Sequence, residues 1–372
     1  MPIHGDRLDK PTYRILRTIN HTGVAEVHLS EHLVFGERTV QKTFDVFGLE
    51  DSIAYQEPQL LRQIKHPNIV PVFDAQPDPD HEDAITMVMP FYEGGSVSDA
   101  LMEGQRFSLV HAAGLGAEIF TALHHLHVHH GYLHRDNKPG NVFLSGDRRT
   151  AYVGDFGSVG KMDEHGETGS VETTPLYRPP EAGPKTGRMT VRSDVYSAGM
   201  VLHELVTGRF PYEILDTEIL RVERRLAAGQ RSIPDRYFAS FAPHVPDELR
   251  RVITKATAKR PQDRWSHAGA VARALFSLQR RMVDWRHIDG DELDGRWEGF
   301  WPPQVPPARQ RQVEIESSIV KGRRRLVARR LGTSGRWSRF AAFPDIRGLA
   351  PADAASVHDF FRLTEARLRV VD

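Results

Sequence analysis

The chain has 372 residues, more than one ordinary hydrophobic core accommodates, and this length suits two lobes with an appendage. Its 49 basic and 49 acidic side chains give a formal net charge of zero, so the chain as a whole has no excess charge for binding a polyanion. There is no cysteine, which excludes disulfides, thiolate metal sites and a cysteine nucleophile. No apolar run reaches the roughly 20 residues that span a bilayer, and the first residues lack the apolar core of a secretory signal. We therefore expect a cytoplasmic protein without a membrane partner.

In chain order, residues 1–10 are expected to be a tail and residues 11–89 a small β-rich lobe. Short β-runs such as Val24–Ser30 and Thr39–Phe44 dominate the lobe, with one helix near Glu57–Ile64. Proline is tolerated in the first turn of a helix but not in its interior, so Pro58 predicts that this helix begins near Glu57.

Residues 90–284 are predicted to be mainly helical. Val110–His125 and Ser193–Thr207 have apolar residues at the i, i+3, i+4 spacing of helices packed on a core. The pattern breaks at Asp284, where Gly, Trp and Asp are frequent, and two Pro pairs follow in Trp301–Pro307. Because proline lacks the backbone donor and favours extended chain, residues 285–310 are predicted to be a semi-rigid linker.

Residues 311–372 are predicted to form a small basic α+β module. We expect three strands, at Gln312–Ser318, Arg325–Leu331 and Trp337–Phe343, with a turn at Lys321-Gly322. A closing amphipathic helix is expected over Pro351–Val370, with apolar positions at Val357, Phe360, Phe361, Leu363 and Leu368.

Two motifs near the middle of the chain carry the chemistry. The first is His134-Arg135-Asp136-Asn137-Lys138-Pro139-Gly140-Asn141, and the second, shortly after it, is Asp155-Phe156-Gly157. A third string, Thr173-Thr174-Pro175-Leu176-Tyr177-Arg178-Pro179-Pro180-Glu181, comes later. Together these motifs resemble the eukaryotic-like (Hanks-type) Ser/Thr protein kinases, a family with soluble bacterial members. The resemblance covers about 270 residues and ends near Trp285; we recognise no family in the rest.

The resemblance implies a two-lobe protein kinase fold of the α+β class, with a small β-rich N-lobe and a large helical C-lobe. ATP would bind between the lobes, and the small α+β module would follow. In such a kinase Asp136 receives the proton of the substrate hydroxyl and Lys138 steadies the γ-phosphate. Asn141 and Asp155 would hold Mg²⁺, or Mn²⁺ in its place, because a hard cation prefers oxygen ligands.

The resemblance also assigns the nucleotide side of the site. Lys42 would meet the α- and β-phosphates and pair with Glu57. Met89 would be the gatekeeper, and adenine would bind the carbonyl of Pro90 and the N–H of Tyr92. Further nucleotide contacts are expected from the Gly-rich-loop register and the floor of the site, at Asn20, Thr22, Gly23, Ala25, Val27 and Phe143.

This half of the site departs from the family pattern. Three family glycines fall on Asn20, Thr22 and Ala25, and Gln41 replaces the usual alanine that packs on adenine. Glycine lets the backbone approach phosphates without an intervening Cβ, so phosphate contact should be looser here. A pseudokinase scaffold is therefore an alternative to an active kinase. A small-molecule phosphotransferase is a second alternative, although such enzymes lack a docking loop like Thr173–Glu181.

The remaining family positions concern activation and support of the loop. Arg135 is expected to pair with a phosphate on the activation segment, placed there by autophosphorylation of Thr168, Ser170 or Thr173. Thr174 should bond Asp136 and Lys138. Glu181 should pair with Arg264, and Asp194 should fix the catalytic loop.

Two further features leave alternatives open. A histidine cluster suggests metal, but a solvated helix end with one structural histidine, His127, is favoured: His124, His125, His127, His129 and His130. By count, residues 303–372 carry 14 basic and 7 acidic side chains. This basic part would dock on the acidic kinase part, recruit an acidic partner or substrate, or bind nucleic acid, for which a basic hairpin alone is weak evidence.

Overall fold

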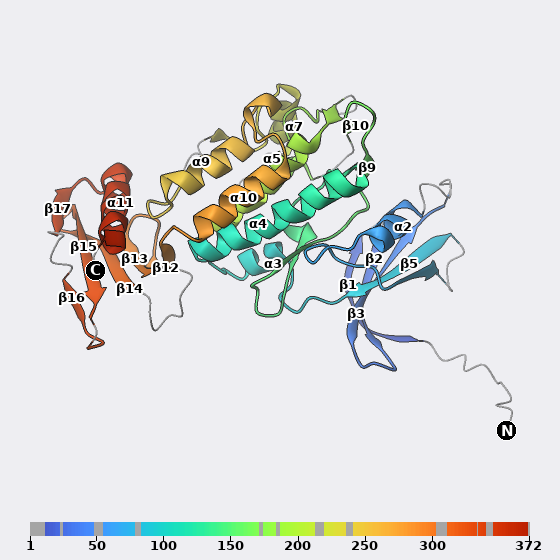
Figure 1. Ribbon diagram of the computed structural model, residues 1–372, viewed down its shortest axis with the longest axis horizontal. Helices are drawn as coiled ribbons and strands as arrows, with labels where there is room; N and C mark the ends of the chain where they lie inside the picture. The colour runs from blue at the N-terminus through green and yellow to red at the C-terminus, as the bar shows by residue number, and fades with distance from the viewer. Residues whose placement is uncertain are drawn as a thin grey trace. The chain divides into compact units, whose positions relative to one another are not determined.

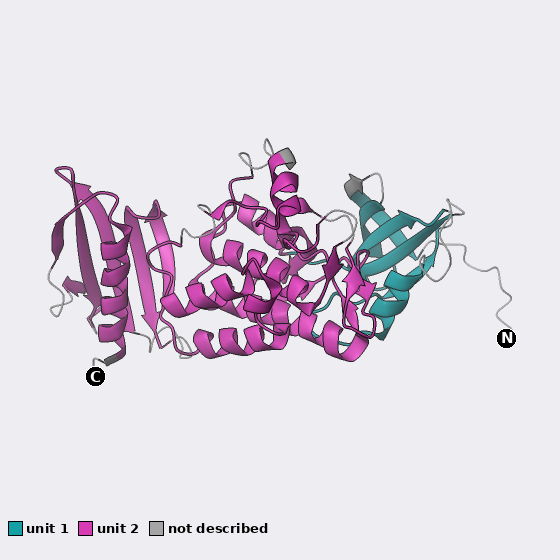
Figure 2. Ribbon diagram, turned by 90° about the horizontal axis from the view of Figure 1, so that it is seen from above, with its two compact units in different colours: residues 1–93 teal, residues 94–372 magenta. Residues whose placement is uncertain are grey.

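The computed structural model describes residues 12–22, 25–47, 55–78, 83–170, 174–183, 187–212, 219–235, 241–302, 311–332, 334–339 and 345–370. The chain divides into two compact units, Met1–Glu93 and Gly94–Asp372 (Figure 2). The boundary falls after Glu93, close to the position expected for the end of the N-lobe. Among the described helices, none has the length and apolar character needed to cross a membrane.

The first unit is an antiparallel sheet with one helix. The strand order is β1-β2-β3-β5-β4, and the elements are β1 (Tyr13–Thr22), β2 (Ala25–His32), β3 (Arg38–Asp45), α2 (Gln56–Gln63), β4 (Asp74–Pro77) and β5 (Ala84–Pro90). Leu60 and Leu61 on α2 and Met87 and Val88 on β5 are buried. The predicted strands and helix are present, and Pro58 lies in the first turn of α2, as its missing N–H requires.

The second unit begins with a helical lobe. Its helices are α3 (Val97–Met102), α4 (Leu109–His125), α5 (Val191–Thr207), α7 (Ile219–Ala227), α9 (Asp247–Ala256) and α10 (Ala268–Gln279). Helix α4 lies at the centre, flanked by α5 and α10 (Figure 1). A Cβ at Gly116 would lie 2.7 Å from Leu202 Cδ1, so glycine permits the close approach of α4 and α5. Helix α5 begins at Val191, two residues before the predicted start at Ser193, because Thr190 and Ser193 form a capping box.

Short antiparallel strand pairs lie between α4 and α5. They are β6 (Tyr132–Leu133) with β9 (Gly160–Lys161), β7 (Val142–Leu144) with β8 (Ala151–Val153), and β10 (Thr168–Gly169) with β11 (Arg188–Met189). The loop 134–141 runs between β6 and β7, and residues 154–159 run between β8 and β9. These pairings bring the two central motifs of the sequence close together.

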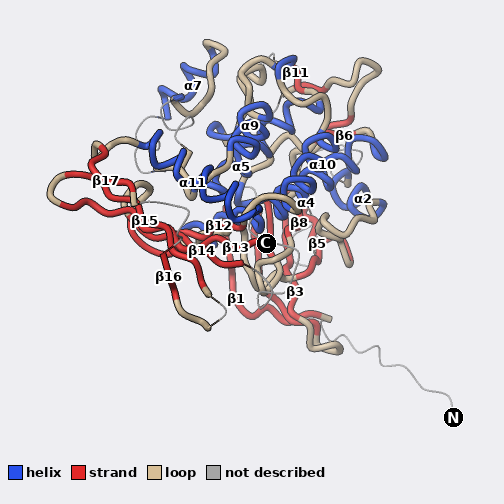
Figure 3. Tube along the Cα trace, turned by 60° about the vertical axis from the view of Figure 1, so that its left-hand side comes forward, coloured by secondary structure: helices blue, strands red, loops and turns tan. Residues whose placement is uncertain are grey.

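The C-terminal part of the second unit is an antiparallel sheet backed by one helix. Its elements are β12 (Asp284–Gly290), β13 (Gly295–Trp301), β14 (Arg311–Val320), β15 (Arg323–Leu331), β16 (Trp337–Arg339), β17 (Ile346–Leu349) and α11 (Ala354–Val370). Strands β12 to β16 pair in sequence order, and β17 also pairs with β15 (Figure 3). We call residues 284–370 the C-terminal module.

The linker predicted over residues 285–310 is therefore wrong for its first part. Trp285 and Trp297 are fully buried, whereas their neighbours Arg286 and Arg296 are exposed, as expected of strands with one buried face. Gly290, at φ 87°, belongs to the hairpin connection between β12 and β13. Residues 303–310, with the second Pro pair, lie outside the described residues.

In the rest of the module, β14, β15 and the turn at Lys321-Gly322 follow the prediction, whereas β17 was not predicted and the helix needs two corrections. Helix α11 begins at Ala354 rather than Pro351, because the Asp353 carboxylate accepts the backbone N–H of Ser356 at 3.0 Å and starts the helix there. Leu363 is 46 % exposed, whereas Val357, Phe360, Phe361 and Leu368 are buried as expected. Strand β16 ends at Arg339, and residues 340–343 of the predicted third strand lie outside the described residues.

Candidate active site

Asp136 is a buried carboxylate at the centre of the catalytic loop. Its Oδ2 accepts a hydrogen bond from Lys138 Nζ at 2.7 Å and another from Asn141 Nδ2 at 3.1 Å. Asn141 Nδ2 also donates to the Asp136 backbone carbonyl at 2.9 Å. The loop therefore gathers a carboxylate, an ammonium group and an amide within hydrogen-bond distance of one another, and such pre-positioning is what phosphoryl transfer needs.

Asp194, near the start of α5, anchors the backbone of this loop through hydrogen bonds. Its Oδ1 accepts the backbone N–H of Arg135 at 2.8 Å, and its Oδ2 accepts the backbone N–H of His134 at 2.8 Å. His127 Nε2 lies 2.8 Å from the same Oδ2. Complete burial alone would raise the pKa of Asp194, but these hydrogen bonds outweigh burial and lower the pKa below its ordinary value. The carboxylate thus stays charged and ties three segments together.

Asn141 and Asp155 can hold a divalent cation. The Asn141 amide nitrogen is committed to Asp136, which leaves the amide oxygen as the atom able to bind a cation. Gly154 N–H donates to the Asn141 carbonyl at 2.9 Å and so places Asp155 beside Asn141. Asp155 has a left-handed backbone, φ 58°, and the next residue, Phe156, is 1 % exposed and anchors this turn. Two neighbouring oxygen donors of this kind fit a hard cation such as Mg²⁺.

Arg135 connects the catalytic loop with the activation segment. Its guanidinium donates to the carbonyls of Ser158 at 2.6 Å, Val159 at 2.6 Å and Gly169 at 2.9 Å. Burial lowers the pKa of this guanidinium. A Cβ on Gly160 would lie 2.6 Å from Arg135 Cζ and 2.7 Å from Thr168 Oγ1, so the guanidinium and the Thr168 hydroxyl converge beside Gly160. Ser170 lies next to this point, and Thr173 lies outside the described residues.

Buried side chains also anchor the segment that follows. Arg264 makes a two-pronged pair with Glu181, at 2.6 and 2.7 Å, so the pairing expected from the sequence is present. Thr174 differs from expectation: within the described residues its side chain makes no hydrogen bond to Asp136 or Lys138. Those two side chains bond each other instead, and Thr174 begins the 3₁₀ turn Pro175–Tyr177.

A second anchor of the same segment was missed in the sequence. Glu204 accepts hydrogen bonds from Tyr177 Oη and Tyr212 Oη, each at 2.7 Å, and from the backbone N–H of Phe210 at 2.9 Å. Burial raises the pKa of the Glu204 carboxyl, and these hydrogen bonds partly offset the effect. The sequence feature that could have identified this anchor is the position of Glu204 between Leu202 and Leu205, where an apolar helix face would otherwise continue.

The first unit contains the expected lysine–glutamate pair. Lys42 Nζ lies 3.2 Å from Glu57 Oε1, and Glu57 is 8 % exposed. Lys42 on β3 faces Met87 on β5, so the lysine lies on the strand that neighbours the expected hinge. A partly buried pair of this kind fixes the position of the ammonium group, which is the property needed to hold phosphate oxygens.

The other nucleotide-side residues have these positions. Asn20 pairs with Val27 and Thr22 with Ala25 in the β1–β2 hairpin, while Gly23 lies outside the described residues. Met89 and Pro90 end β5, with Tyr92 just after them, and Gln41 faces Val88 on that strand. In the second unit Phe143 lies on β7 and bridges to Ser96.

The histidine cluster lies at the end of α4 and the turn after it. His127 is buried and bonds Asp194, as expected of a structural histidine. The rings of His125 and His129 are 4.7 Å apart, and those of His125 and His130 are 5.3 Å apart. Burial lowers the pKa of His125 and of His130. In the described part of the chain, no group of three or more His, Asp or Glu side chains is placed to hold a metal ion.

The fold and this site together define a protein kinase. The family model described as protein kinase domain matches residues 23–276, more than half of the chain, and the chain belongs to this family. The family uses ATP and a divalent metal ion.

Several bacterial relatives carry names of the same kind. The probable serine/threonine-protein kinase PknB of Lactococcus lactis is 30 % identical over 261 residues, 68 % of this chain and 40 % of that protein. The DNA damage-responsive serine/threonine-protein kinase RqkA of Deinococcus radiodurans is 29 % identical over 328 residues, 87 % of this chain and 48 % of that protein. Serine/threonine-protein kinase PrkC of Bacillus subtilis is 28 % identical over 265 residues, 69 % of this chain and 39 % of that protein. The chain therefore spans less than half the length of these relatives.

Proposed function

We propose that this protein is an ATP-dependent Ser/Thr protein kinase. The observation that carries the proposal is the buried Asp136 carboxylate, oriented by Lys138 and Asn141 above the charged Asp194. The Lys42–Glu57 pair in the first unit supports the proposal. A scaffold that transfers no phosphate has no need of both this pair and the Asp136 contacts of the catalytic loop. The lysine two residues after the catalytic aspartate is the Ser/Thr pattern.

In the proposed reaction a serine or threonine hydroxyl of a protein attacks the γ-phosphorus of ATP. The new oxygen–phosphorus bond forms as the bond to the β–γ bridging oxygen breaks, and the hydroxyl proton passes to an oxygen of Asp136. Lys138 and Lys42 would stabilise negative charge on the phosphates. Asn141 and Asp155 would hold Mg²⁺, which neutralises phosphate charge when bound; Mn²⁺ satisfies the same oxygen donors.

We propose that the kinase also phosphorylates its own activation segment, with Thr168 as the leading candidate beside Ser170 and Thr173. The support is the approach of the Thr168 hydroxyl to the Arg135 guanidinium at Gly160. A phosphate on Thr168 would be near this cation and could replace backbone carbonyls as its partner, because charged acceptors bind guanidinium more strongly than carbonyls do.

A pseudokinase scaffold is the second candidate, and its supporting observation is the set of replacements at Asn20, Thr22, Ala25 and Gln41. With side chains at the glycine positions of the hairpin, ATP would bind without efficient transfer. The two candidates agree on the fold and differ in turnover.

We propose that the C-terminal module docks within the same chain rather than recruiting an acidic partner or nucleic acid. Its arginines support this choice, because many are neutralised inside the module: Arg329 bonds Glu314 and Glu316, and Arg325 bonds Asp345. Contacts to the helical lobe run instead through His358, whose Nε2 lies 3.1 Å from Asp247 Oδ1. We also propose a cytoplasmic location, where ATP is abundant and a cysteine-free chain is at no disadvantage.

The test measures transfer of labelled γ-phosphate to a protein with accessible serines and threonines, beside an aminoglycoside as a small-molecule acceptor. Asp136→Asn should abolish transfer, whereas Asp147→Asn, on an exposed turn, should leave the rate within about twofold. Transfer to the aminoglycoside but to no protein would contradict the proposal. Nucleotide binding without transfer to any acceptor would favour the scaffold.

A further inference from the structure

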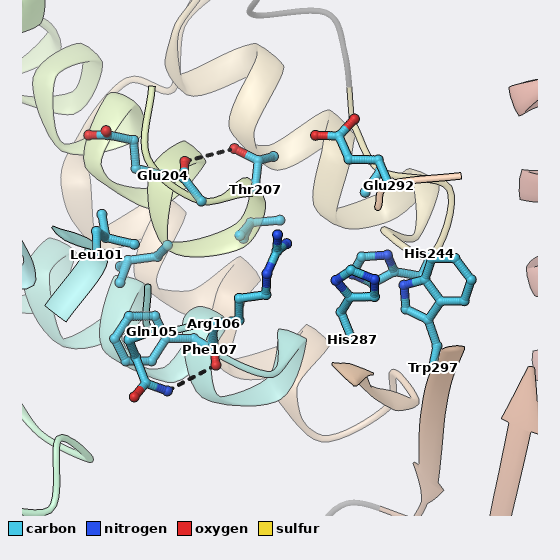
Figure 4. Close-up of a pocket in the computed structure, with 14 residues that line it drawn as sticks. Leu101, Gln105, Arg106, Phe107, Glu204, Thr207, His244, His287, Glu292 and Trp297 are labelled. Atoms are coloured by element: carbon cyan, nitrogen blue, oxygen red, sulfur yellow. Dashed lines mark hydrogen bonds between the residues drawn. The ribbon is translucent and has the colours of Figure 1, made fainter. Parts of the chain in front are cut away.

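A pocket lies within the second unit, where the helical lobe meets the C-terminal module. One wall comes from the helical lobe, with Arg106 and Phe107 before α4 and the end of α5 at Thr207. The opposite wall contains His287 and Trp297 of the module, and His244 comes from the segment before α9. Figure 4 shows Arg106 extending into the pocket between Thr207 and the three rings of His287, His244 and Trp297. None of these residues belongs to the candidate active site.

Three ring nitrogens in this wall are buried and have no hydrogen-bond partner among the described residues. They are Nδ1 of His244, Nε2 of His287 and Nε1 of Trp297. The rings are packed together: those of His287 and Trp297 stack at 5.0 Å, and that of His244 lies 6.1 Å from that of Trp297. His244 is 9 % exposed and Trp297 is fully buried. Buried polar atoms are normally satisfied, so three in one wall indicate that a polar species completes them.

The donors in this wall select the chemistry of that species. The indole N–H of Trp297 and the guanidinium of Arg106 can only donate, so the species must accept hydrogen bonds. Burial lowers the pKa of His244 to about 3 and also lowers the pKa of His287, with Arg106 a further cause for both. Both rings are therefore neutral at neutral pH, and each donates to the species in the tautomer that carries the ring proton on its unpartnered nitrogen.

The guanidinium of Arg106, unpaired among the described residues, favours an anion over a neutral acceptor. Within the described part of the chain, the Arg106 side chain has neither a carboxylate nor a hydrogen-bond partner. Two carboxylates also line the pocket. Glu204 already accepts hydrogen bonds from the hydroxyls of Tyr177 and Tyr212 and from the backbone N–H of Phe210, and Glu292 belongs to the loop between β12 and β13. The space amounts to about 30 Å³, which suits a few polar atoms and not a nucleotide.

We propose that this pocket binds a small oxyanion, of the size of a carboxylate or phosphate group, through Arg106, Trp297, His244 and His287. Because the walls come from both the helical lobe and the module, the bound anion would strengthen the contact between them. Any group that binds only the docked arrangement stabilises it by mass action, so anion concentration would set how firmly the module is held.

The experiment uses the full chain with a non-hydrolysable ATP analogue in excess, so that nucleotide phosphate positions are already filled. Binding of sodium phosphate, sodium sulfate and sodium acetate is measured by calorimetry and by thermal shift, with sodium chloride at equal ionic strength as the reference. Arg106→Gln removes the cation, and Trp297→Phe removes the N–H but keeps a packed ring. Arg336→Gln, in the turn between β15 and β16, is the matched control.

We expect at least one oxyanion to bind one per chain and to raise the unfolding temperature above that in chloride. Arg106→Gln and Trp297→Phe should each weaken binding roughly tenfold or more, and Arg336→Gln should change it less than twofold. If no oxyanion exceeds chloride, the pocket holds water alone and the proposal fails. If an oxyanion binds Arg106→Gln as tightly as the unaltered chain, the site is elsewhere and the proposal is equally overturned.

Discussion

Arg135 shows how much of this site depends on single backbone positions. It has a left-handed backbone, φ 68°, which is unfavourable for a side chain larger than glycine. The conformation persists because Asp194 accepts its N–H and three carbonyls accept its guanidinium. Gly160 makes this arrangement possible, because the Arg135 guanidinium occupies the space that a side chain at residue 160 would fill.

Gly160→Ala should therefore displace the Arg135 guanidinium, because the new methyl would lie 2.6 Å from Cζ. We expect a loss of about 1–3 kcal/mol in the free energy of unfolding, measured in urea, and slower phosphate transfer. Gly169→Ala in the same segment is the control, since a Cβ there meets nothing within 4 Å, and it should cost less than about 0.5 kcal/mol. Equal losses in the two variants would contradict this reading.

At this scale the sequence predicts the identity of motif residues better than their partners. The Glu181–Arg264 and Lys42–Glu57 pairs are present because opposite charges at family positions leave little choice. The Thr174 contact is not, because a hydroxyl can bond many groups and its partners depend on the backbone between them. The roles assigned to the remaining site residues stay predictions.

At the scale of elements, amino-acid composition predicts the wrong start for the C-terminal module, which begins with β12 at Asp284 rather than after a linker. The Gly and Asp residues between Trp285 and Trp297 indicate a loop, and the Pro pairs after them indicate a linker, so composition predicts irregular structure where β12 and β13 lie. The tryptophans were the informative signal, since two large apolar side chains in such a segment need a core to cover them. Helix α11 provides that core.

Helix α11 offers a matched pair of variants. Phe361 is 1 % exposed, with its ring edge-on to Trp285 at 4.9 Å and to Trp297 at 5.3 Å, whereas Leu363 is 46 % exposed. Phe361→Ala should lower the free energy of unfolding by about 3–5 kcal/mol through the cavity it leaves. Leu363→Ala should change it by less than about 0.5 kcal/mol. Chemical unfolding followed by tryptophan fluorescence measures both, and similar losses would show that α11 does not face the sheet as described.

At the scale of the whole molecule, the module and the helical lobe of the second unit share buried residues. His244 precedes α9 in the helical lobe, yet its ring lies 6.0 Å from Phe361 and 6.1 Å from Trp297. His358 on α11 reaches back, with Nδ1 2.6 Å from the carbonyl of Pro243. Sequence periodicity predicts helices and strands one at a time. It therefore cannot predict a contact between residues more than a hundred positions apart.

This shared core predicts a dependence of stability on pH. Burial lowers the pKa of His244 from its ordinary 6.5 to about 3, with His287, Arg250 and Arg106 adding to the effect. Below pH 6.5 the unfolded chain takes up a proton that the folded chain does not, so stability falls as pH falls. His244 alone should cost about 2 kcal/mol between pH 7 and pH 5.

The measurement compares the free energy of unfolding of the unaltered chain and of His244→Phe at several pH values. The difference between the two should shift by that amount over the interval, while His165→Phe, at an exposed position, should run parallel to the unaltered chain. A constant difference between the unaltered chain and His244→Phe would mean that His244 is not buried in the folded protein.

The central claim is that the assembled catalytic loop transfers phosphate, and intact-mass spectrometry tests it most directly. Purified protein is incubated with ATP and Mg²⁺ beside the Asp136→Asn variant. We predict mass increases in steps of one phosphate in the unaltered chain and none in the variant, with peptide mapping placing a phosphate at Thr168, Ser170 or Thr173. If neither protein gains mass although a thermal shift shows that ATP binds, the chain is a scaffold and the claim is wrong.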